Sequence, residues 1–394
     1  MRGHEAEHDE LKRAAAAFAA RTLNDDVARR DREEDVSLPG WKACAEFGLQ
    51  GMLVAPEYGG AGMDLRAVVA TLEGLGYGCR DRGLVSSLNA HLWGCVQTLN
   101  DFGSAGQKVE LLPGLVDGRW IGANAMTEPE SGSDALALRT RARRTDDGYV
   151  LDGRKCFVTN APAAEVFIVY ARTGDGPAFS SLSCFAVRAG TPGLSVAPPA
   201  SKMGLRTSPM SDVFFSECRV PSSARLGAEG SGAMMLMSTM EWERSLVLAV
   251  AVGGMEYQLE QCAEQVARRV AGNHPLRQRQ AVTQKLAEMK LRLEAGRGLL
   301  YRAVELKRAG KSAFMESMLA KIALSEAGVA NARDAMQIHG GYGYMSEAGL
   351  ERELRDALGS TIHSGATEVL KDAVAMLLLA GSAGLAGRKG GGTA

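Results

Sequence analysis

Three patterns of apolar and polar positions follow one another along the chain. Up to about residue 119, apolar residues recur at helical spacing, interrupted by a glycine-rich loop at 55–62. One such helix face would carry Leu11, Ala15, Phe18 and Thr22. The first third of the chain is therefore predicted to be helical.

From about residue 120 to residue 226, short β-rich runs alternate with turns. The predicted strands are 149–151, 155–159, 166–172, 183–187 and 213–220. A turn at Asp152-Gly153 would separate the first two. Prolines also gather in this region, where they would break helices. A small β domain is expected here.

Long helical patterns return after about residue 230. The expected helices are 234–270, 276–308 and 313–336. The expected domains are a helical one at 1–119, a β domain at 120–228 and a helical one at 229–394. The glycine-rich end of the last domain is expected to fray.

This order of elements excludes two common nucleotide-binding folds. It lacks the alternation of strands and helices that a Rossmann or P-loop enzyme requires. Gly310-Lys311-Ser312 looks like the end of a phosphate-binding loop, but Glu305 stands where the first glycine is required. A predicted helix, and not a strand, also precedes that segment.

Composition and charge narrow the class of protein. Apolar residues make up 46% of the 394 residues and charged residues 23%, as in ordinary globular proteins. The 45 Lys and Arg residues balance 46 Asp and Glu residues, which gives no electrostatic case for binding nucleic acid. No apolar run reaches the roughly 18 residues of a membrane span, and the N-terminus lacks the apolar core of a signal peptide. A cytoplasmic protein that binds neither nucleic acid nor membrane is expected.

The cysteines indicate neither disulfides nor a metal site. Seven are present, an odd number, and none forms a Cys-x-x-Cys pair. We therefore expect reduced, mostly buried thiols and no bound metal.

The most informative segment is 125–134, which reads Ala-Met-Thr-Glu-Pro-Glu-Ser-Gly-Ser-Asp. Its hydroxyls, proline and glycine predict a tight turn with exposed N–H groups, which suits anionic or electron-rich ligand atoms. An ordinary capped turn explains the same residues equally well. Taken whole, the segment resembles the first signature of the acyl-CoA dehydrogenase family of flavoproteins. The domain order of that family also resembles the pattern above, over almost the whole chain.

The resemblance implies an α+β fold. Its parts would be an N-terminal all-α domain, a middle small β-barrel or sandwich, and a C-terminal four-helix bundle. It also implies FAD as the cofactor, with segment 125–134 along the flavin ring. The backbone of Met126 and the hydroxyl of Thr127 would bond the pyrimidine edge of the ring, and Ser133 would bond the FAD phosphate or the thioester arm of the substrate.

A second segment, Lys-Cys-Phe-Val-Thr-Asn at 155–160, is similar to the family's Lys-x-Trp-Ile-Thr-Asn. Phe157 takes the place of the aromatic residue that covers one flavin face, and Thr159 the place that bonds flavin N5. Phe157 also fits an aromatic residue of the β core, and the two roles are compatible.

Other cofactor residues follow from the resemblance in the C-terminal third. Gln337 and Gly341 lie in Gln-Ile-His-Gly-Gly-Tyr-Gly, similar to the family element that receives the adenosine half of FAD from a neighbouring subunit. Arg269 matches an arginine suited to the pyrophosphate. Gly272 departs from the family pattern, because a phenylalanine is usual there. Thr367 and Glu368 are also placed at the cofactor, and a homotetramer or homodimer is implied.

The family reaction needs a carboxylate base, and the residue at its commonest position is Ser364. Some branches place the base on an earlier helix, directly before an arginine, and Glu243 before Arg244 matches that pattern. Glu241 and Arg244 would form an i, i+3 pair. The alternative for Glu243 is a surface helix charge. If it is the base, its pKa is expected to rise on burial beside the acyl chain.

Substrate contacts are assigned by the same resemblance. The backbone N–H of Ser364 would donate to the thioester carbonyl oxygen, with Ser133, Glu241 and Arg244 nearby. His363 replaces a usual aromatic residue and would either bond a polar substrate or serve the structure.

The sequence therefore predicts an FAD-dependent acyl-CoA dehydrogenase that forms an α,β-double bond, with Glu243 as the base. Its electrons would pass to an electron-transfer flavoprotein or oxygen. Three alternatives remain open. They are a dehydrogenase of an aminoacyl or hydroxyacyl thioester held on a carrier protein, a flavin-dependent oxygenase, and a non-catalytic flavin- or acyl-binding protein.

Overall fold

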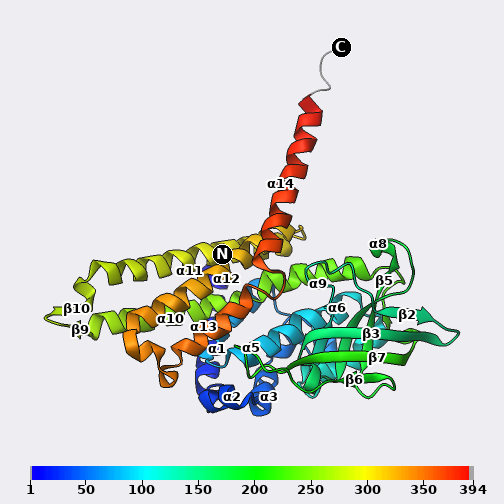
Figure 1. Ribbon diagram of the computed structural model, residues 1–394, viewed down its shortest axis with the longest axis horizontal. Helices are drawn as coiled ribbons and strands as arrows, with labels where there is room; N and C mark the ends of the chain where they lie inside the picture. The colour runs from blue at the N-terminus through cyan, green and yellow to red at the C-terminus, as the bar shows by residue number, and fades with distance from the viewer. Residues whose placement is uncertain (1, 390–394) are drawn as a thin grey trace. The chain divides into compact units, whose positions relative to one another are not determined.

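The computed structural model describes residues 2–389, and the chain divides into two compact units, residues 1–254 and 255–394. Helices open the first unit, an eight-stranded sheet follows them, and the second unit is largely helical (Figure 1). The order of helices, sheet and helices is the one expected. The division into units does not fall at the expected domain boundaries of 119 and 228, which stay a prediction. No helix among the described residues has the length and apolar character needed to cross a membrane.

The first unit begins with a series of helices. They are α1 (Arg2–Thr22), α2 (Val27–Glu33), α3 (Leu38–Glu46), α4 (Leu65–Gly78), α5 (Arg82–Asn89), a π-helix (Ala90–Val96), α6 (Gln97–Phe102) and α7 (Ala105–Val116). Their N-termini are capped as local sequence predicts: the side chains of Asp64, Asp81 and Ser104 accept backbone N–H groups at the starts of α4, α5 and α7.

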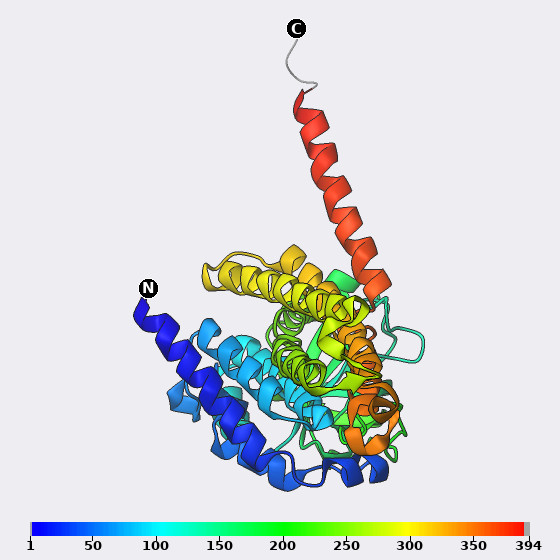
Figure 2. The same cartoon turned by 90° about the vertical axis from the view of Figure 1, so that its left-hand side faces the viewer.

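Helices α1 and α4 approach each other closely, as Figure 2 shows for the dark-blue and lighter-blue helices. A Cβ atom on Gly74 would lie only 2.1 Å from the carbonyl oxygen of Lys12, so glycine is required there. The fully buried positions of α1 are Ala15 and Ala19, which are small enough for this contact. Thr22 is exposed, so the predicted helix face is wrong at that position, where Leu23 is buried instead.

The sheet follows in the order β6-β7-β3-β2-β4-β5-β8, and β1 pairs with β4. Its strands are β1 (Gly122–Ala125), β2 (Arg141–Arg144), β3 (Gly148–Thr159), β4 (Val166–Arg172), β5 (Leu182–Arg188), β6 (Leu194–Val196), β7 (Met210–Pro221) and β8 (Arg225–Leu226). Figure 1 shows β3, β7 and β6 as neighbours. A short helix, α8 (Ala178–Ser181), precedes β5.

Strand β4 is buried on both faces, which explains its unbroken apolar run. Val166, Ile168 and Tyr170 pack into one core with α6, α7 and α9. Phe167 and Val169 point the other way, into the core of the β domain. The sheet thereby joins the helical and β parts of this unit.

The turn predicted at Asp152-Gly153 does not exist. Strand β3 runs through these residues, with an irregularity in its register against β7 between Leu151 and Gly153. A Cβ atom on Gly153 would lie 2.5 Å from Oγ1 of Thr140, so the glycine serves a close contact and not a turn.

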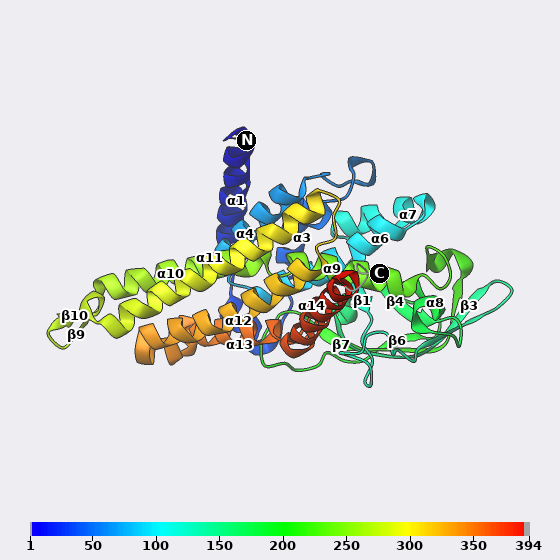
Figure 3. The same ribbon diagram turned by 90° about the horizontal axis from the view of Figure 1, so that it is seen from above.

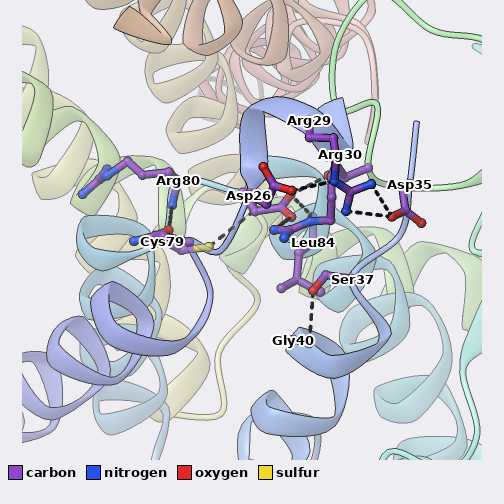
Figure 4. Close-up of polar contacts among 12 residues, drawn as sticks. Asp26, Arg29, Arg30, Asp35, Ser37, Gly40, Cys79, Arg80 and Leu84 are labelled. Carbon is purple, nitrogen blue, oxygen red and sulfur yellow. Dashed lines mark hydrogen bonds and ion pairs between the residues drawn. The ribbon is translucent and has the colours of Figure 1, made fainter. Parts of the chain in front are cut away.

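A buried carboxylate, Asp81, joins three segments of the first unit. It accepts a 2.9 Å hydrogen bond from the Arg30 guanidinium of α2 and one of 3.0 Å from the backbone N–H of Leu84 in α5. The hydroxyl of Thr207, before β7, also donates to it. Figure 4 shows Arg30 and Leu84 here, beside the exposed pair of Arg29 and Asp26.

The pattern over 234–270 forms two helices, α9 (Gly232–Leu246) and α10 (Ala249–Arg268). The interruption follows Leu246, and the carbonyl of Val247 accepts a 3.3 Å hydrogen bond from the side-chain amide of Asn89. Asn89 therefore satisfies a carbonyl at the end of α9.

The second unit contains a short hairpin and long helices (Figure 3). They are β9 (Val270–Ala271), β10 (His274–Pro275), α11 (Gln280–Arg308), α12 (Phe314–His339), α13 (Leu350–Ser360) and α14 (Thr367–Lys389). Helices α11 and α12 pack along each other around a core that includes Met289 and Ala335. Helix α14 continues to Lys389, and residues 390–394 lie outside the described part, so the expected fraying of the C-terminal end stays a prediction.

Candidate active site

The predicted signature segment begins where β1 ends. Glu128 and Ser131 exchange two backbone hydrogen bonds of 3.1 Å, which close a tight turn. Met126 and Thr127, before the turn, are half-buried, and Ser133, within the loop that follows, is exposed. The predicted tight turn is therefore present, and the choice between a ligand-binding turn and an ordinary capped turn stays open.

A buried ion pair holds this turn in place. The ammonium of Lys155 lies 2.7 Å from the carboxylate of Glu128 and donates to the carbonyl of Met126 at 3.1 Å. Glu128 also accepts the backbone N–H groups of Arg139 at 2.6 Å and Thr140 at 2.9 Å. These contacts connect β3 to the signature segment.

Burial shifts the pKa values of both groups of this pair toward their neutral forms, and the interaction between the two groups opposes that shift. Burial lowers the pKa of Lys155 to about 8, although the Glu128 carboxylate opposes this shift. For Glu128, burial raises the pKa, but the charge and hydrogen bond of Lys155 outweigh it, and the pKa lies below its usual range. Both groups are therefore ionised at neutral pH.

A β-bulge in β3 sets the orientation of Phe157. Lys155 pairs with Val213 and Val158 pairs with Ser211, so two residues of β3 face one residue of β7. Phe157 adopts the left-handed backbone region, with φ of 55°, and its side chain is 69% exposed. Phe157 is therefore not an aromatic residue of the β core.

The bulge also brings the two predicted segments together. The N–H of Cys156, the other bulge residue, donates to the carbonyl of Thr127 at 2.9 Å. Asn160, directly after the half-buried Thr159, donates its side-chain amide to the carbonyls of Ser87 and Gly122 at 2.9 and 3.1 Å. Both ends of the segment 155–160 are thus fixed.

Glu243 lies on the inner side of α9. Leu236, Thr239 and Glu243 are spaced so that they share one helix face, and the first two are buried. The hydroxyl of Thr239 hydrogen-bonds those of Thr98 and Tyr170 at 3.0 and 3.2 Å. Glu243 itself is half-buried at the end of this face.

Glu241 is half-buried as well, and helical spacing puts it on another side of α9, the side of the exposed Met234 and Met237. The structure therefore separates the two carboxylates, as helical geometry requires. Arg244 is half-buried; burial lowers its pKa, and the neighbouring Glu243 carboxylate opposes that shift. The predicted pair of Glu241 with Arg244 and the predicted rise in the pKa of Glu243 stay predictions.

In the second unit, two predicted cofactor residues lie at exposed ends of elements. Gln337 is exposed in the last turn of α12, and Gly341 is exposed in the short helix Gly340–Tyr344 that follows. A Cβ atom on Gly341 would meet nothing within 4 Å. Arg269 is exposed directly after α10, and Gly272 has φ of 63° in the β9–β10 hairpin.

The turn 361–367, before α14, holds the remaining predicted residues. Ser364 is in the left-handed region with φ of 57°, which costs free energy for a residue other than glycine. The imidazole Nδ1 of His363 lies 3.0 Å from the hydroxyl oxygen of Ser364. Burial and then the charge of Lys321 lower the pKa of His363 to about 4, so its ring is neutral at pH 7.

Lys321 fixes this turn from α12. Its side chain is fully buried, and its ammonium donates to the carbonyl of Gly365 at 2.7 Å. Thr367 is 2% exposed, and its hydroxyl oxygen is buried without a hydrogen-bond partner among the described residues. Glu368 is exposed beside it.

Reasoning from the sequence missed the residues that hold these segments in place. Lys155, Glu128 and Asn160 stand inside the recognised segments, but no role was assigned to them. A lysine between strand residues at 155 was the available signal, since a buried lysine needs a partner. Lys321 carried no such signal, because it lies within a long helix.

The first unit therefore presents an exposed aromatic ring at a bulge of its sheet and a half-buried carboxylate on the following helix, α9. Family models for the acyl-CoA dehydrogenase N-terminal, middle and C-terminal domains match residues 5–119, 123–218 and 230–379. The chain belongs to the acyl-CoA dehydrogenase family.

Among curated relatives, an L-prolyl-[peptidyl-carrier protein] dehydrogenase of Pseudomonas fluorescens is 38% identical over 371 residues, 93% of this chain and 98% of that protein. An acyl-CoA dehydrogenase of Bacillus subtilis is 33% identical over 372 residues, 94% of this chain and 98% of that protein. The short-chain specific mitochondrial enzyme of Rattus norvegicus is 35% identical over 94% of this chain and 90% of its own length.

Solved structures agree with the fold. The prolyl acyl carrier protein oxidase AnaB matches with a TM-score of 0.93 and 38% identity, over 94% of this chain and 98% of that one. PigA with FAD and proline matches with a TM-score of 0.92 and 36% identity, over 94% and 97%. The predicted family and the three-part α+β fold are therefore confirmed.

Proposed function

We propose that this protein is an FAD-dependent dehydrogenase that desaturates an aminoacyl thioester held on a carrier protein. Membership of the acyl-CoA dehydrogenase family supports the reaction class. The observation that carries the proposal is the position of Glu243, on the inner face of α9 within the unit that holds the signature segment. Since serine occupies the commonest base position, at 364, this carboxylate is available to take its place.

The residues present fit FAD. Phe157 presents an exposed aromatic ring beside the paired segments 126–127 and 155–160, and Thr159 ends the second of them. In the other unit, the unbonded buried hydroxyl of Thr367 and the open backbone at Gly341 are suited to a ligand. FAD bound at the paired segments of the first unit would accept the hydride from the β-carbon of the substrate.

Glu243 would remove the α-proton of the thioester. Glu243 is a half-buried carboxylate, and a positioned carboxylate can act as a general base in proton abstraction. The backbone N–H of Ser364, held in a left-handed turn by the contact of Lys321 with Gly365, would donate to the thioester oxygen. The proton then rests on Glu243 as the double bond forms between Cα and Cβ.

The carrier-bound aminoacyl substrate is favoured over a simple acyl-CoA by two observations. Two curated relatives, of Pseudomonas fluorescens and of a Serratia species, are named L-prolyl-[peptidyl-carrier protein] dehydrogenases and are 38% and 37% identical to this chain. His363, a neutral imidazole at neutral pH, stands where the family usually has an aromatic residue and can hydrogen-bond a substrate amine. A short-chain acyl-CoA is the second candidate, since relatives of that name are 35% identical.

We further propose a cytoplasmic homotetramer or homodimer that passes its electrons to an electron-transfer flavoprotein or to oxygen. Helix α14 supports self-association, since its exposed residues include Met376, Leu378 and Leu379. A solved structure named for the electron-transferring flavoprotein of Acidaminococcus fermentans is similar to this chain, with a TM-score of 0.90 and 32% identity.

Anaerobic titration with a panel of thioesters tests the substrate. The purified yellow protein is mixed with prolyl, cyclopentanecarbonyl and butyryl groups, each on a carrier protein and on CoA. We expect the prolyl carrier-protein thioester to bleach the flavin fastest. Fastest bleaching by butyryl-CoA would favour the second candidate. A flavin that no thioester reduces, but that reacts with oxygen once reduced, would indicate an oxygenase.

The role of Glu243 is tested by Glu243→Gln, which keeps the size of the side chain and removes the base. We expect flavin reduction by the best thioester to slow by about 10³-fold or more, with FAD still bound. Glu110→Gln, at an exposed position of α7 with no role assigned to it, is the matched control and is expected to keep a near-normal rate. Normal reduction by Glu243→Gln would exclude this residue as the base.

A further inference from the structure

Lys155 is a charged side chain without exposed surface, directly beneath the signature segment. Its side chain is 0% exposed, and that of Glu128 is 6% exposed. Removing two charges from water is costly, and apolar residues of similar size would often be at least as stable. The pair is therefore poorly explained by stability alone.

The two charges of this ion pair contact different parts of the surrounding backbone. At its negative end, the carboxylate of Glu128 accepts the backbone N–H groups of Arg139 and Thr140, so its charge is spread over several donors. At its positive end, the ammonium contacts the carbonyl of Met126 at 3.1 Å. The positive end thus adjoins the peptide group between Met126 and Thr127, within the segment that the proposed function places beside the flavin.

That peptide group consists of the carbonyl of Met126 and the N–H of Thr127. A cation bonded to the carbonyl oxygen draws electron density from the N–H and makes it a stronger donor, because linked hydrogen bonds polarise one another. The hydrogen bond from the N–H of Cys156 to the carbonyl of Thr127 keeps the next peptide group in place. Lys155 therefore affects the segment by its charge as well as by its contact.

We propose that Lys155 is a positioning residue that raises the reduction potential of the bound flavin by polarising the Met126–Thr127 peptide group. The proposal rests on the proposed function, because it requires FAD at this segment. Reduction adds negative charge to the flavin, so a positive potential beside the ring favours the reduced form. Hydride transfer from the substrate becomes correspondingly more favourable.

The test uses the holoenzyme of Lys155→Gln/Glu128→Gln. Two amides keep a hydrogen-bonded pair but carry no charge. The flavin is equilibrated with a reference dye of known potential, and its reduced-to-oxidised ratio is measured from the absorption spectrum. We expect the ratio to fall at least tenfold at a fixed dye ratio, which corresponds to about 30 mV for a two-electron couple.

The matched control is Arg154→Gln/Asp212→Asn. This neighbouring pair has the same formal charges and an N–O distance of 2.6 Å, but its side chains are 52% and 24% exposed. Solvent screens such a pair, so its ratio is expected to stay within about twofold of the wild-type value.

An unchanged ratio in the buried-pair variant, or an equal change in both variants, would overturn the proposal. A buried-pair variant that is folded by circular dichroism but holds no flavin would overturn it too, because Lys155 would then be required for binding and not for tuning. The dye titration contains no thioester, so an error in the substrate does not affect it. A wild-type chain that binds no flavin would instead contradict the proposed function.

Discussion

Single buried charges in this protein are placed where they connect segments that are distant in sequence. Asp81 joins α2, α5 and the segment before β7, and Glu128 joins the signature turn to β3. Each carboxylate accepts backbone N–H groups as well as a cation. Such groups are expensive to disturb on one side only, because the partner is left buried and uncompensated.

Asp81→Ala tests this at the residue scale. Removing the carboxylate leaves the buried guanidinium of Arg30 without its partner and removes the cap of α5. We expect the free energy of unfolding to fall by about 3–5 kcal/mol, measured by urea denaturation. Asp175→Ala, which breaks the exposed pair with Arg141, is expected to cost less than about 1 kcal/mol. Similar losses in the two variants would show that burial does not govern these pairs.

Sequence patterns located most of the candidate residues, because each lies in a short local segment whose spacing is distinctive. Met126, Thr127 and Thr159 were found in this way. The exposure of Phe157 was not predictable, since it depends on how β3 pairs with β7. The contact of Lys155 with Glu128 joins residues 27 positions apart, and only burial shows that they must meet.

At the scale of elements, the π-helix Ala90–Val96 holds a histidine that links α-helical and β structure. His91 is fully buried, and its Nδ1 accepts the backbone N–H of Gly122, the first residue of β1, at 2.9 Å. Burial lowers the pKa of His91 to about 3. The ring is therefore neutral in the folded protein wherever the fold is stable.

This histidine makes stability depend on pH. Its folded pKa of about 3 lies below the value near 6.5 in the unfolded chain, so only the unfolded chain binds a proton between these values. Stability is complete above about pH 6.5 and is lost as pH falls, by about 1.4 kcal/mol per pH unit. In His91→Gln, the free energy of unfolding is expected to depend less steeply on pH, by the contribution of one proton. The measurement is urea denaturation at several pH values from 7 to 5. His274→Gln, at an exposed position, should leave the slope unchanged.

Elements were predicted with mixed success, for physical reasons. The two-sided apolar run of β4 was found at 166–172 because burial on both faces leaves a clear signal. Strand β2 was missed, since three of its four residues are exposed arginines. The long pattern at 234–270 was not recognised as two helices, because the amide of Asn89 that satisfies Val247 comes from a distant helix.

At the scale of the whole molecule, the proposed function implies that one chain does not complete a cofactor site alone. Arg269 and Gln337 are exposed at the ends of their helices, where a second chain can approach. If they serve a neighbour's FAD, the defects of two different inactive variants can be corrected in a mixed oligomer.

Mixing Glu243→Gln with Arg269→Glu tests this sharing. In a mixed dimer, one site combines both defects, and the other combines an intact Glu243 with an intact Arg269. Random mixing after co-expression is therefore expected to restore about a quarter of wild-type activity. The separately purified variants, combined without exchange of subunits, serve as the control. If co-expression restores no activity, each chain completes its own site.

The bulge at Cys156-Phe157 also bears on how this protein can change in evolution. Because side chains alternate along a strand, loss of one bulge residue would reverse every position beyond it, including Val158 and Thr159. Substitutions earlier in β3 leave that alternation intact. Homologues that retain the flavin are therefore expected to keep the length of this segment constant, even where its residues differ, and to place their insertions and deletions elsewhere.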